Sequence, residues 1–372
     1  MDLRNSKKLV FVFAMLLAVA VSGLAQSGRA QPKPTPTPDD DPVKVETEEV
    51  KVNMLAFDDE GSFVSNVKEA DLVVTENNIL HQAISVRRIP ANVLIIMDTG
   101  GELRSVKTLD HTRKVARGVL NSLRKEDSVA LLQYADNATI VSEWTTDKAQ
   151  ISTAIGRTKF GIKSAFVDAL KLAREFMSAG ELENKHLVLI TDGTDSSADS
   201  QRKEMAIRGL LSTDIAVHVL SYTRMEAADI EPRTKAITNS PPIKAMPDEI
   251  AATLPNGVRD HAQAPKIGPT INMDRTLLKK LRARKDDLEQ SEVTLGTLVE
   301  NTNGTLVVPE TLEEMELKTA TVAKMIDASY VLTYIPKVPF AEKGGVRNIE
   351  VTSKRPGLIV QAKRKFVVPA KR

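Results

Sequence analysis

A run of five apolar residues, Val93 to Met97, constrains the fold of this chain more than any other stretch. The run is too short for an ordinary helix, and it is bounded by Pro90 before it and by Gly100-Gly101 after it. We therefore expect a strand that is buried on both faces, as in the middle of a parallel sheet. Asp98 follows at the carboxyl end of this strand, where open α/β sheets place their ligand sites.

A second apolar run, His186 to Thr191, ends in Asp192 in the same way. Between and around the two runs, strand patterns alternate with helix patterns, including helices expected over residues 103–123 and 164–179. This alternation predicts an α/β fold with a doubly wound, mostly parallel sheet and helices on both faces. Two carboxylates at two strand ends indicate one shared cation.

At these loops the chain resembles the von Willebrand factor A family. The metal-ion-dependent adhesion site of that family uses a D-x-S-x-S loop after the first strand, a threonine from a second loop and an aspartate after the fourth strand. Asp98 and Asp192 match the two aspartates. Residues 161–170, GIKSAFVDAL, are similar to the family's G-G-T-A-x-x-D-A-L, which puts Ser164 in the place of the threonine. The resemblance implies a von Willebrand A-like core.

The first loop departs from the family pattern and makes the adhesion site degenerate. Gly100 and Glu102 replace the two serines, and Glu102 offers a carboxylate that could ligate the ion itself. Lys163 stands where the family has a glycine, and its ammonium could neutralise the carboxylates without any metal. A plainer interpretation is that the carboxylates only cap their loops. The candidate ligands of Mg²⁺ or another divalent cation are Asp98, Ser164, Asp192 and Glu102.

Residues 1–25 have the pattern of a secretory signal peptide. Basic residues including Lys7 and Lys8 precede an apolar run from Leu9 to Val21, and small residues follow through Ala25. The run is shorter than the ~20 residues of a membrane-spanning helix, which favours cleavage over an uncleaved anchor. No cysteine is present, so no disulfide can stabilise the mature protein. We expect an exported bacterial protein, periplasmic or secreted, without a membrane span in the mature chain.

The two ends of the chain are predicted to form one β-sandwich. After a proline-rich linker at 26–42, residues 43–90 contain three strand patterns and are similar to the short Ig-like lead-in of related proteins. Residues 329–372 contain further strand patterns, and together the two segments would suffice for a sandwich around an inserted α/β domain at 91–328. Separate small β units are the alternative.

Residues 223–272 interrupt the α/β pattern with seven prolines and little periodicity. The segment leaves the strand at 215–222 from the same edge of the sheet as Asp98 and Asp192. A loop of this length is either disordered or functional. We expect an unstructured insertion or, alternatively, a lid or contact surface over the site.

The remaining features argue against nucleic-acid binding and against catalysis. The formal charge is only +2 and aromatic residues make up 4%, which is not the composition of a nucleic-acid-binding surface. Phosphate-binding, zinc-protease and serine-hydrolase motifs are absent, and the five histidines have no ligand spacing. We therefore predict a non-enzymatic protein-binding module for adhesion or scaffolding, whose protein partner contacts the carboxyl-end face of the sheet.

Two alternative functions remain consistent with the sequence. In the first, the chain is a structural, metal-independent scaffold that makes its contacts through the sandwich or through residues 223–272. In the second, more remote one, it is a hydrolase. The sequence names neither the partner nor the oligomeric state.

Overall fold

A computed structural model describes residues 48–101, 103–197, 199–240, 255, 270–271, 274–339 and 345–368. Four predictions lie wholly or mostly outside the described residues: the signal peptide at 1–25, the linker at 26–42, Glu102 and the insertion at 223–272. The elements below belong to one unit of the chain, Thr47–Arg372. In the described part, no helix is both long and apolar enough to cross a membrane.

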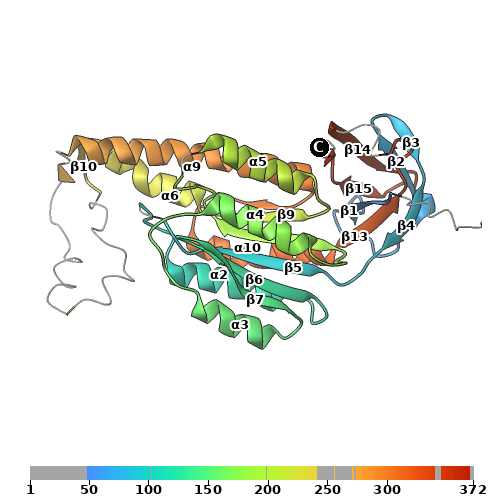
Figure 1. Ribbon diagram of the computed structural model, residues 1–372, viewed down its shortest axis with the longest axis horizontal. Helices are drawn as coiled ribbons and strands as arrows, with labels where there is room; N and C mark the ends of the chain where they lie inside the picture. The colour runs from blue at the N-terminus through green and yellow to red at the C-terminus, as the bar shows by residue number, and fades with distance from the viewer. Residues whose placement is uncertain are drawn as a thin grey trace, which may run out of the picture. The chain divides into compact units, whose positions relative to one another are not determined.

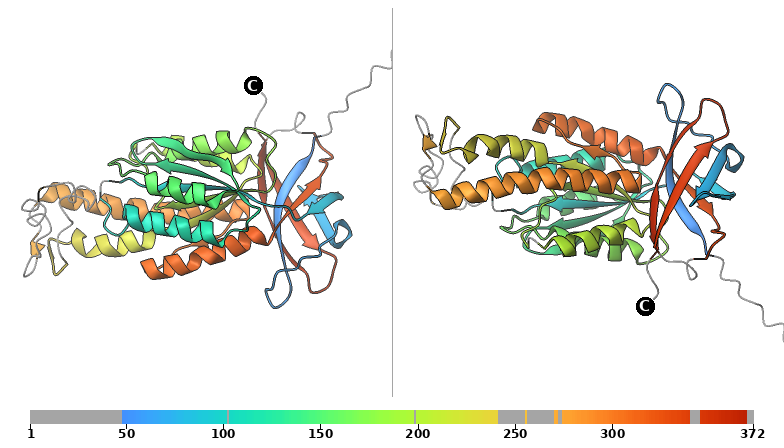
Figure 2. Two further views of the ribbon diagram at one scale, coloured as in Figure 1. Left: turned by 90° about the horizontal axis from the view of Figure 1, so that it is seen from below. Right: turned by 90° about the horizontal axis from the view of Figure 1, so that it is seen from above.

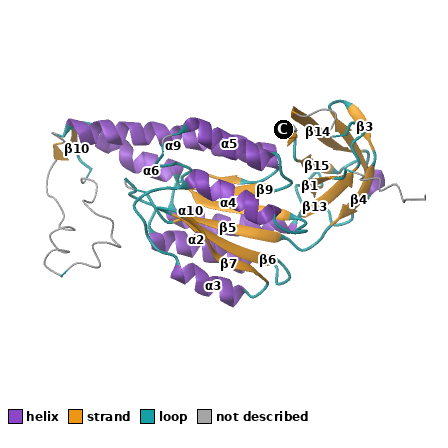
Figure 3. Ribbon diagram, in the orientation of Figure 1, coloured by secondary structure: helices purple, strands orange, loops and turns teal. Residues whose placement is uncertain are grey.

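Among the described residues, six strands form the central sheet, in the order β12-β9-β8-β5-β6-β7. Neighbouring strands run parallel except β6 and β7, which are antiparallel. The strands are β5 (Asn92–Asp98), β6 (Ser128–Tyr134), β7 (Ala138–Thr145), β8 (Lys185–Thr191), β9 (Ala216–Ser221) and β12 (Leu306–Val307). This confirms the predicted doubly wound, mostly parallel sheet, with β5 near its middle (Figure 3).

Helices cover both faces of the central sheet (Figure 1). The helices on one face are α2 (Leu109–Ser122), α3 (Lys148–Arg157) and α10 (Leu312–Asp327). The helices on the other face are α4 (Phe166–Ser178), α5 (Ser200–Leu211) and α9 (Arg275–Thr302). Side chains of β5 alternate between the two hydrophobic clusters, with Ile95 in the first and Leu94 and Ile96 in the second. The strand is therefore buried on both faces, as its apolar run predicted.

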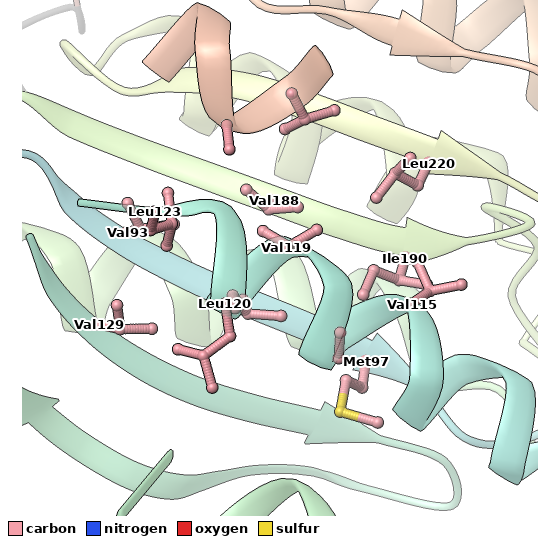
Figure 4. Close-up of a cluster of buried hydrophobic side chains, with 14 of the residues drawn as sticks. Val93, Met97, Val115, Val119, Leu120, Leu123, Val129, Val188, Ile190 and Leu220 are labelled. Atoms are coloured by element: carbon pink, nitrogen blue, oxygen red, sulfur yellow. The ribbon is translucent and has the colours of Figure 1, made fainter. Parts of the chain in front are cut away.

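The first cluster shows how an amphipathic helix fixes the sheet. Val115 and Val119 of α2 lie over Val188 and Ile190 of β8 (Figure 4). These four side chains are at most 1% exposed. Burial of each contributes roughly 1.5–3 kcal/mol relative to an exposed side chain, so the helix is held mainly by its packed face.

Helix α2 begins later than its sequence predicted. A helix was expected over residues 103–123, but α2 starts at Leu109, because Thr108 caps it by accepting the backbone N–H of His111. Such a cap is worth about 1 kcal/mol. Residues 103–108 consequently form a loop at the carboxyl end of β5, and this loop carries a residue of the site.

The prediction that residues 223–272 lack structure was wrong for their first part. Helix α6 (Thr223–Ile230) and a short 3-10 helix η2 (Glu231–Thr234) follow β9 directly, and the small pair β10 (Ile237–Thr238) and β11 (Thr270–Ile271) comes next. Ile230 at the end of α6 packs on Leu281 and Leu288 of α9 in a separate apolar cluster. Packing on α9 therefore supplies the burial that stabilises this short helix.

The first and last described strands pair with each other in two further sheets (Figure 2). One has the order β15-β1-β13-β4 and the other β16-β14-β2-β3. The strands are β1 (Val50–Phe57), β2 (Leu72–Glu76), β3 (Ile79–His81), β4 (Ala83–Arg87), β13 (Ser329–Tyr334), β14 (Gly345–Ser353), β15 (Ile359–Ala362) and β16 (Lys365–Val368). This pairing confirms the predicted β-sandwich-like part built from both ends; the proposed domain boundaries at 43–90, 91–328 and 329–372 stay predictions.

A single apolar cluster joins these two sheets and contains one buried ion pair. Val52 and Leu332 of the first sheet share the cluster with Val74 and Val351 of the second. The Arg347 guanidinium donates to Glu76 Oε1 at 2.5 Å, and the hydroxyl of Tyr334 donates to Glu76 Oε2 at 2.7 Å. Chain segments more than 250 residues apart thus depend on one another for burial and for charge neutralisation.

The sandwich contacts the amino-terminal ends of the central strands. Asn53 Nδ2 of β1 donates to the carbonyl oxygens of Lys185 and Asp214, at 3.3 and 3.0 Å. Lys185 begins β8, and Asp214 precedes β9. The carboxyl ends of the same strands, which bear Asp98 and Asp192, are therefore at the opposite edge of the sheet.

Candidate functional site

The carboxyl ends of β5 and β8 bring the two predicted aspartates together. These strands are parallel neighbours, with Met97 paired to Ile190, and the strand order reverses at β5 because β6 lies on its other side. Asp98 ends β5 and Asp192 directly follows β8. Both side chains are 0% exposed. The switch point of the sheet, where α/β proteins hold their ligands, thus contains two buried carboxyl groups.

Lys107 places a cation between these two carboxyl groups. Its Nζ donates to Asp98 Oδ2 at 2.6 Å and to Asp192 Oδ2 at 2.8 Å. All three side chains are 0% exposed. Removal of one member of such a buried set leaves an uncompensated charge, which costs several kcal/mol.

Arg284 of α9 adds a second cation. Its Nη2 donates to Asp192 Oδ2 at 2.9 Å, and its Nη1 donates to Thr194 Oγ1. The Arg284 side chain is 12% exposed. Lys107 and Arg284 thus pair both aspartates with cations of the chain itself, and in this sense the edge is closed; the buried carboxyl group of Glu226 also interacts electrostatically with Arg284.

Glu226 of α6 fixes the loop that carries Lys107. Its Oε1 accepts the backbone N–H groups of Val106 and Lys107 at 2.9 and 2.6 Å, and its Oε2 accepts that of Ser105 at 2.8 Å. Glu226 is fully buried. These bonds satisfy three N–H groups that lie before the start of α2 and have no helical partner there.

Every carboxylate oxygen of the two aspartates accepts at least one hydrogen bond. Asp98 Oδ1 accepts the N–H of Gly100 at 3.2 Å, while its Oδ2 also accepts from Thr191 Oγ1 at 3.3 Å. Asp192 Oδ1 accepts the N–H and the hydroxyl of Thr194, at 3.0 and 2.6 Å. The carboxyl groups are therefore fixed by their own loops as well as by the two cations.

The pKa values of the site follow from burial and charge. Burial and the neighbouring charge of Asp192 raise the pKa of Asp98, in spite of Lys107. Burial also acts to raise the pKa of Asp192, but the charges of Lys107 and Arg284 outweigh it and lower that pKa. For Lys107, burial acts to lower the pKa, whereas the two aspartates raise it. Lys107 therefore stays an ammonium and Asp192 a carboxylate near neutral pH.

The site lies within a segment that matches a known family. Residues 93–194, from the apolar run of β5 to the loop after β8, match the model of the von Willebrand factor type A domain. The matched segment includes both aspartates and Lys107. These residues form a von Willebrand factor type A domain. A comparison with curated proteins finds no match to the chain.

Several solved structures are similar to this chain at low identity. BatB, a conserved hypothetical protein from Bacteroides thetaiotaomicron, is 16% identical, with 63% of this chain and 98% of that chain covered and a TM-score of 0.37. A von Willebrand factor type A protein from Catenulispora acidiphila is 10% identical, with 87% and 74% covered and a TM-score of 0.40. The manganese-loaded TRAP protein of Plasmodium vivax is also 10% identical, with 80% and 100% covered and a TM-score of 0.38.

The predicted site residues have different places at the edge of this von Willebrand factor type A domain. Asp98 and Asp192 meet as expected. Ser164 is buried on the second loop, where its Oγ donates to the carbonyl of Thr194 at 2.8 Å. Glu102 lies outside the described residues. The role of these residues as metal ligands stays a prediction.

The cation between the aspartates is Lys107, and the interpretation that placed Lys163 there was wrong. Lys163 is exposed, and its backbone N–H donates to Asp136 Oδ1 at 2.8 Å. Asp136 Oδ1 also accepts the N–H of Ile162, at 3.1 Å. This anchoring turns the backbone of the second loop, and not the Lys163 side chain, toward the first loop.

At Gly100 there is no room for a serine side chain, so the difference from the family loop is larger than the absence of one hydroxyl group. A Cβ atom built on Gly100 would lie 2.0 Å from the carbonyl oxygen of Lys163 and 2.9 Å from the Cα of Ala135. Both obstacles are backbone and cannot rotate away. The first and second loops of this von Willebrand factor type A domain are therefore closer together than a serine at residue 100 would permit.

As these residues lie, they do not fit a divalent cation. The facing oxygens of Asp98 and Asp192 both accept hydrogen bonds from Lys107, whose ammonium occupies the space between them. A hard cation such as Mg²⁺ would need about six oxygen ligands around that space. Across the described residues, no group of three or more His, Cys, Asp and Glu side chains is arranged to hold a metal ion.

Sequence reasoning missed Lys107, Arg284 and Glu226. For Lys107, the cap signal of Thr108 was the available clue, because it starts the helix after Lys107 and leaves that residue in the loop. For Glu226, the helix-forming run from Arg224 to Ala228 could have indicated α6. Arg284 offers no comparable signal, since it is one of many basic residues on a long, charged helix.

Proposed function

We propose that this chain is an exported, non-enzymatic protein-binding module for adhesion or scaffolding, and that it works without a metal ion at its von Willebrand factor type A edge. Members of this domain family are in general interaction modules, which supports the protein-binding part. The pattern of residues 1–25 supports export. The chemistry of the edge supports the absence of a metal requirement.

The single observation that carries the proposal is the position of Lys107. Its ammonium lies 2.6 and 2.8 Å from the two aspartates that would have to hold an ion. A divalent cation would have to displace a buried ammonium and also the hydrogen bond from Arg284 to Asp192. At an effective dielectric constant of 20, two like unit charges ~4 Å apart repel by ~4 kcal/mol, so ion and lysine would not share the site.

The second loop offers a partner a fixed surface beside the closed edge. Ile162 is 53% exposed, and Lys163 next to it is exposed as well. Their backbone N–H groups are both bound to Asp136, so little backbone entropy would be lost when a partner contacts them. An apolar side chain next to a lysine suits a protein surface with an apolar centre and an acidic rim.

Divalent-ion titration tests the metal-free part of the proposal. Calorimetry of the full chain with MgCl₂ and with MnCl₂ should give no more heat than a titration with a monovalent salt of equal ionic strength. Thermal unfolding should be unchanged, whereas a bound ion at ~100 times its Kd would stabilise the chain by ~2.7 kcal/mol. Millimolar or tighter binding of either ion would overturn the proposal.

Site-specific photo-crosslinking tests the protein-binding part. A photoreactive amino acid replaces Ile162 in the full chain, and a matched control carries it at Val346, which is 58% exposed on β14. Expressed in the source cells, the Ile162 probe should give a discrete crosslinked protein that persists with EDTA. A crosslink from Val346 alone would instead favour a scaffold that uses its sandwich, and a crosslink lost with EDTA would contradict the metal-free edge.

A further inference from the structure

A groove of about 550 Å³ lies between α5 and α9, beside the closed edge. The two helices are drawn next to each other in Figure 1, on the face of the central sheet that α4 also covers. The groove begins at Thr194 and Asp195, in the loop that follows β8, and continues along both helices to Leu211 and Thr297. Its volume is within the ~300–1,000 Å³ range of pockets that bind ligands.

The far part of the groove has an apolar floor, and its rim carries the ion pair of Glu204 with Arg208 together with Thr294 and Thr297. Ile207 and Leu211 of α5 are partly buried and pack on the core cluster beneath, so they form a floor. Val293 of α9 is 71% exposed on the opposite wall. An exposed valine on the wall of a groove with an apolar floor leaves apolar surface that a partner could bury, and such burial favours binding.

The near part of the groove is acidic. Asp195, Asp199 and Asp287 line it, and within the described residues none of these carboxylates lies within salt-bridge distance of a lysine or arginine. Asp195 accepts the backbone N–H groups of Val167 and Ser197 and the hydroxyl of Ser197, and the ammonium of Lys203 is near enough to interact electrostatically with Asp195 and Asp287.

Lys203 lies among these acids but is engaged with the protein itself. Its Nζ donates to the carbonyl of Gly193 at 2.8 Å and to Ser291 Oγ at 3.2 Å, and it lies 5.6 Å from the centre of the Phe166 ring. Burial lowers the pKa of Lys203. The lysine therefore fixes the top of α5 to α9, and the three carboxylates keep an excess of negative charge.

We propose that the α5–α9 groove binds a helical segment of a protein partner that carries aliphatic side chains and, roughly two turns away, a lysine or arginine. This inference rests on the proposed protein-binding function and adds the chemistry of the partner. Aliphatic side chains fit over Ile207 and Leu211 against Val293, while the cation meets the acidic part at Asp199 and Asp287.

The spacing follows from the geometry of α5. Asp199 caps the start of α5 and Ile207 lies eight residues later, about 12 Å along a helix at 1.5 Å per residue. A partner helix laid along the groove therefore needs its cation roughly two turns from the aliphatic side chain that reaches Ile207. A partner with acidic residues at that place would meet like charge.

The probe is a phage-displayed library of random peptides long enough for four helical turns, selected on the full chain. Enriched peptides should combine aliphatic residues at helical spacing with Lys or Arg. Val293→Asp and Asp287→Lys should each weaken binding of an enriched peptide by at least ~10-fold, about 1.4 kcal/mol. Two matched controls should change it less than ~2-fold: Leu317→Asp, at an exposed leucine of α10, and Asp286→Lys, next to Asp287 but not in the groove.

The possible outcomes separate this inference from the proposed function. If no basic and aliphatic peptide is enriched, or if the two groove variants bind as well as the wild type, the groove proposal fails, while crosslinking from Ile162 still decides protein binding. If peptide binding in the groove requires magnesium, the proposal of a metal-free function is wrong, whereas the proposal of peptide binding in the groove is supported. Self-association that Val293→Asp abolishes, or peptide binding that appears only after deletion of residues 241–269, would overturn the inference in favour of a second copy or of this chain's own segment.

Discussion

The backbone N–H of Lys107 donates to Glu226 Oε1 at 2.6 Å, while the side chain of the same lysine joins Asp98 and Asp192. The buried carboxylate on α6 thus positions the residue that closes the von Willebrand factor type A edge. Glu226 and Arg284 both lie beyond the segment 93–194 that matches the family. The edge of this domain is therefore completed by helices outside the matched segment.

Replacement of Lys107 by methionine should destabilise the chain by about 3–5 kcal/mol, because two buried carboxyl groups then share only Arg284. Urea unfolding at neutral pH measures the change. Lys114→Met is a matched control, since this lysine is 65% exposed in its pair with Glu316, and it should cost less than ~1 kcal/mol. If Lys107→Met combined with Asp98→Asn were no more stable than Lys107→Met alone, the charge explanation would be wrong.

Glu226→Gln should lower the free energy of unfolding by about 1–3 kcal/mol, because an amide NH₂ would then face one of the three backbone N–H donors of residues 105–107. Hydrogen exchange should also become faster at the amides of Ser105, Val106 and Lys107. Glu231→Gln, at an exposed partner of Lys285, should stay within ~1 kcal/mol of the wild type. Unchanged exchange at the three amides would show that Glu226 does not hold the loop.

Gly100→Ser, which introduces the serine of the family loop, should destabilise the chain by about 1–3 kcal/mol or more and should not create a magnesium site. The cause is the 2.0 Å approach of the new Cβ to the Lys163 carbonyl. Gly156→Ser is the control, because it lies in α3 with only the end of Arg117 nearby, at 3.5 Å. Calorimetric magnesium binding by Gly100→Ser would contradict the steric argument.

Stability should fall in acid because of His186 and His218. Burial lowers the pKa of both imidazoles, that of His218 to about 4 from 6.5, and their ring nitrogens lie 3.0 Å apart. Below pH 6.5 the unfolded chain binds protons that the folded chain does not, so folding stability decreases as pH falls toward about 4.

The slope can reach ~2.7 kcal/mol per pH unit if both histidines contribute, at ~1.36 kcal/mol for each proton. Urea midpoints measured across this range test it. The double variant His186→Gln with His218→Gln should flatten the slope, whereas His111→Gln, on the outer side of α2, should not. An equally steep slope in the double variant would assign the acid sensitivity to other groups.

Deletion of residues 340–372 should loosen the N-terminal strands, because β2 then loses its partner β14 and Glu76 loses Arg347. The unpaired buried carboxylate alone should cost about 3–5 kcal/mol. Hydrogen exchange should show lost protection in β1 and β2 but retained protection in β5 and β8. Deletion of residues 369–372 serves as the control. Equal protection of β2 after the longer deletion would refute the composite sandwich.

Local patterns in the sequence determined the fold and half of the site. The apolar run from Val93 to Met97, between Pro90 and Gly100, predicted a strand buried on both faces, and all five side chains are 0% exposed. This works because side-chain periodicity and turn residues act over a few neighbours in the chain. Since strand ends carry the ligand edge of an α/β sheet, the same patterns also located Asp98 and Asp192.

Only the tertiary structure decided which cation lies between these aspartates. Lys163 lies in a loop that resembles the family pattern and stands there in place of a glycine, yet it is exposed, while Lys107 reaches both carboxyl groups from a loop that the sequence predicted as helix. Arg284 meets Asp192 across 92 residues of chain. Charge neutralisation depends on separations of a few ångströms in a buried environment, and long side chains set these separations through packing that no spacing in the sequence encodes.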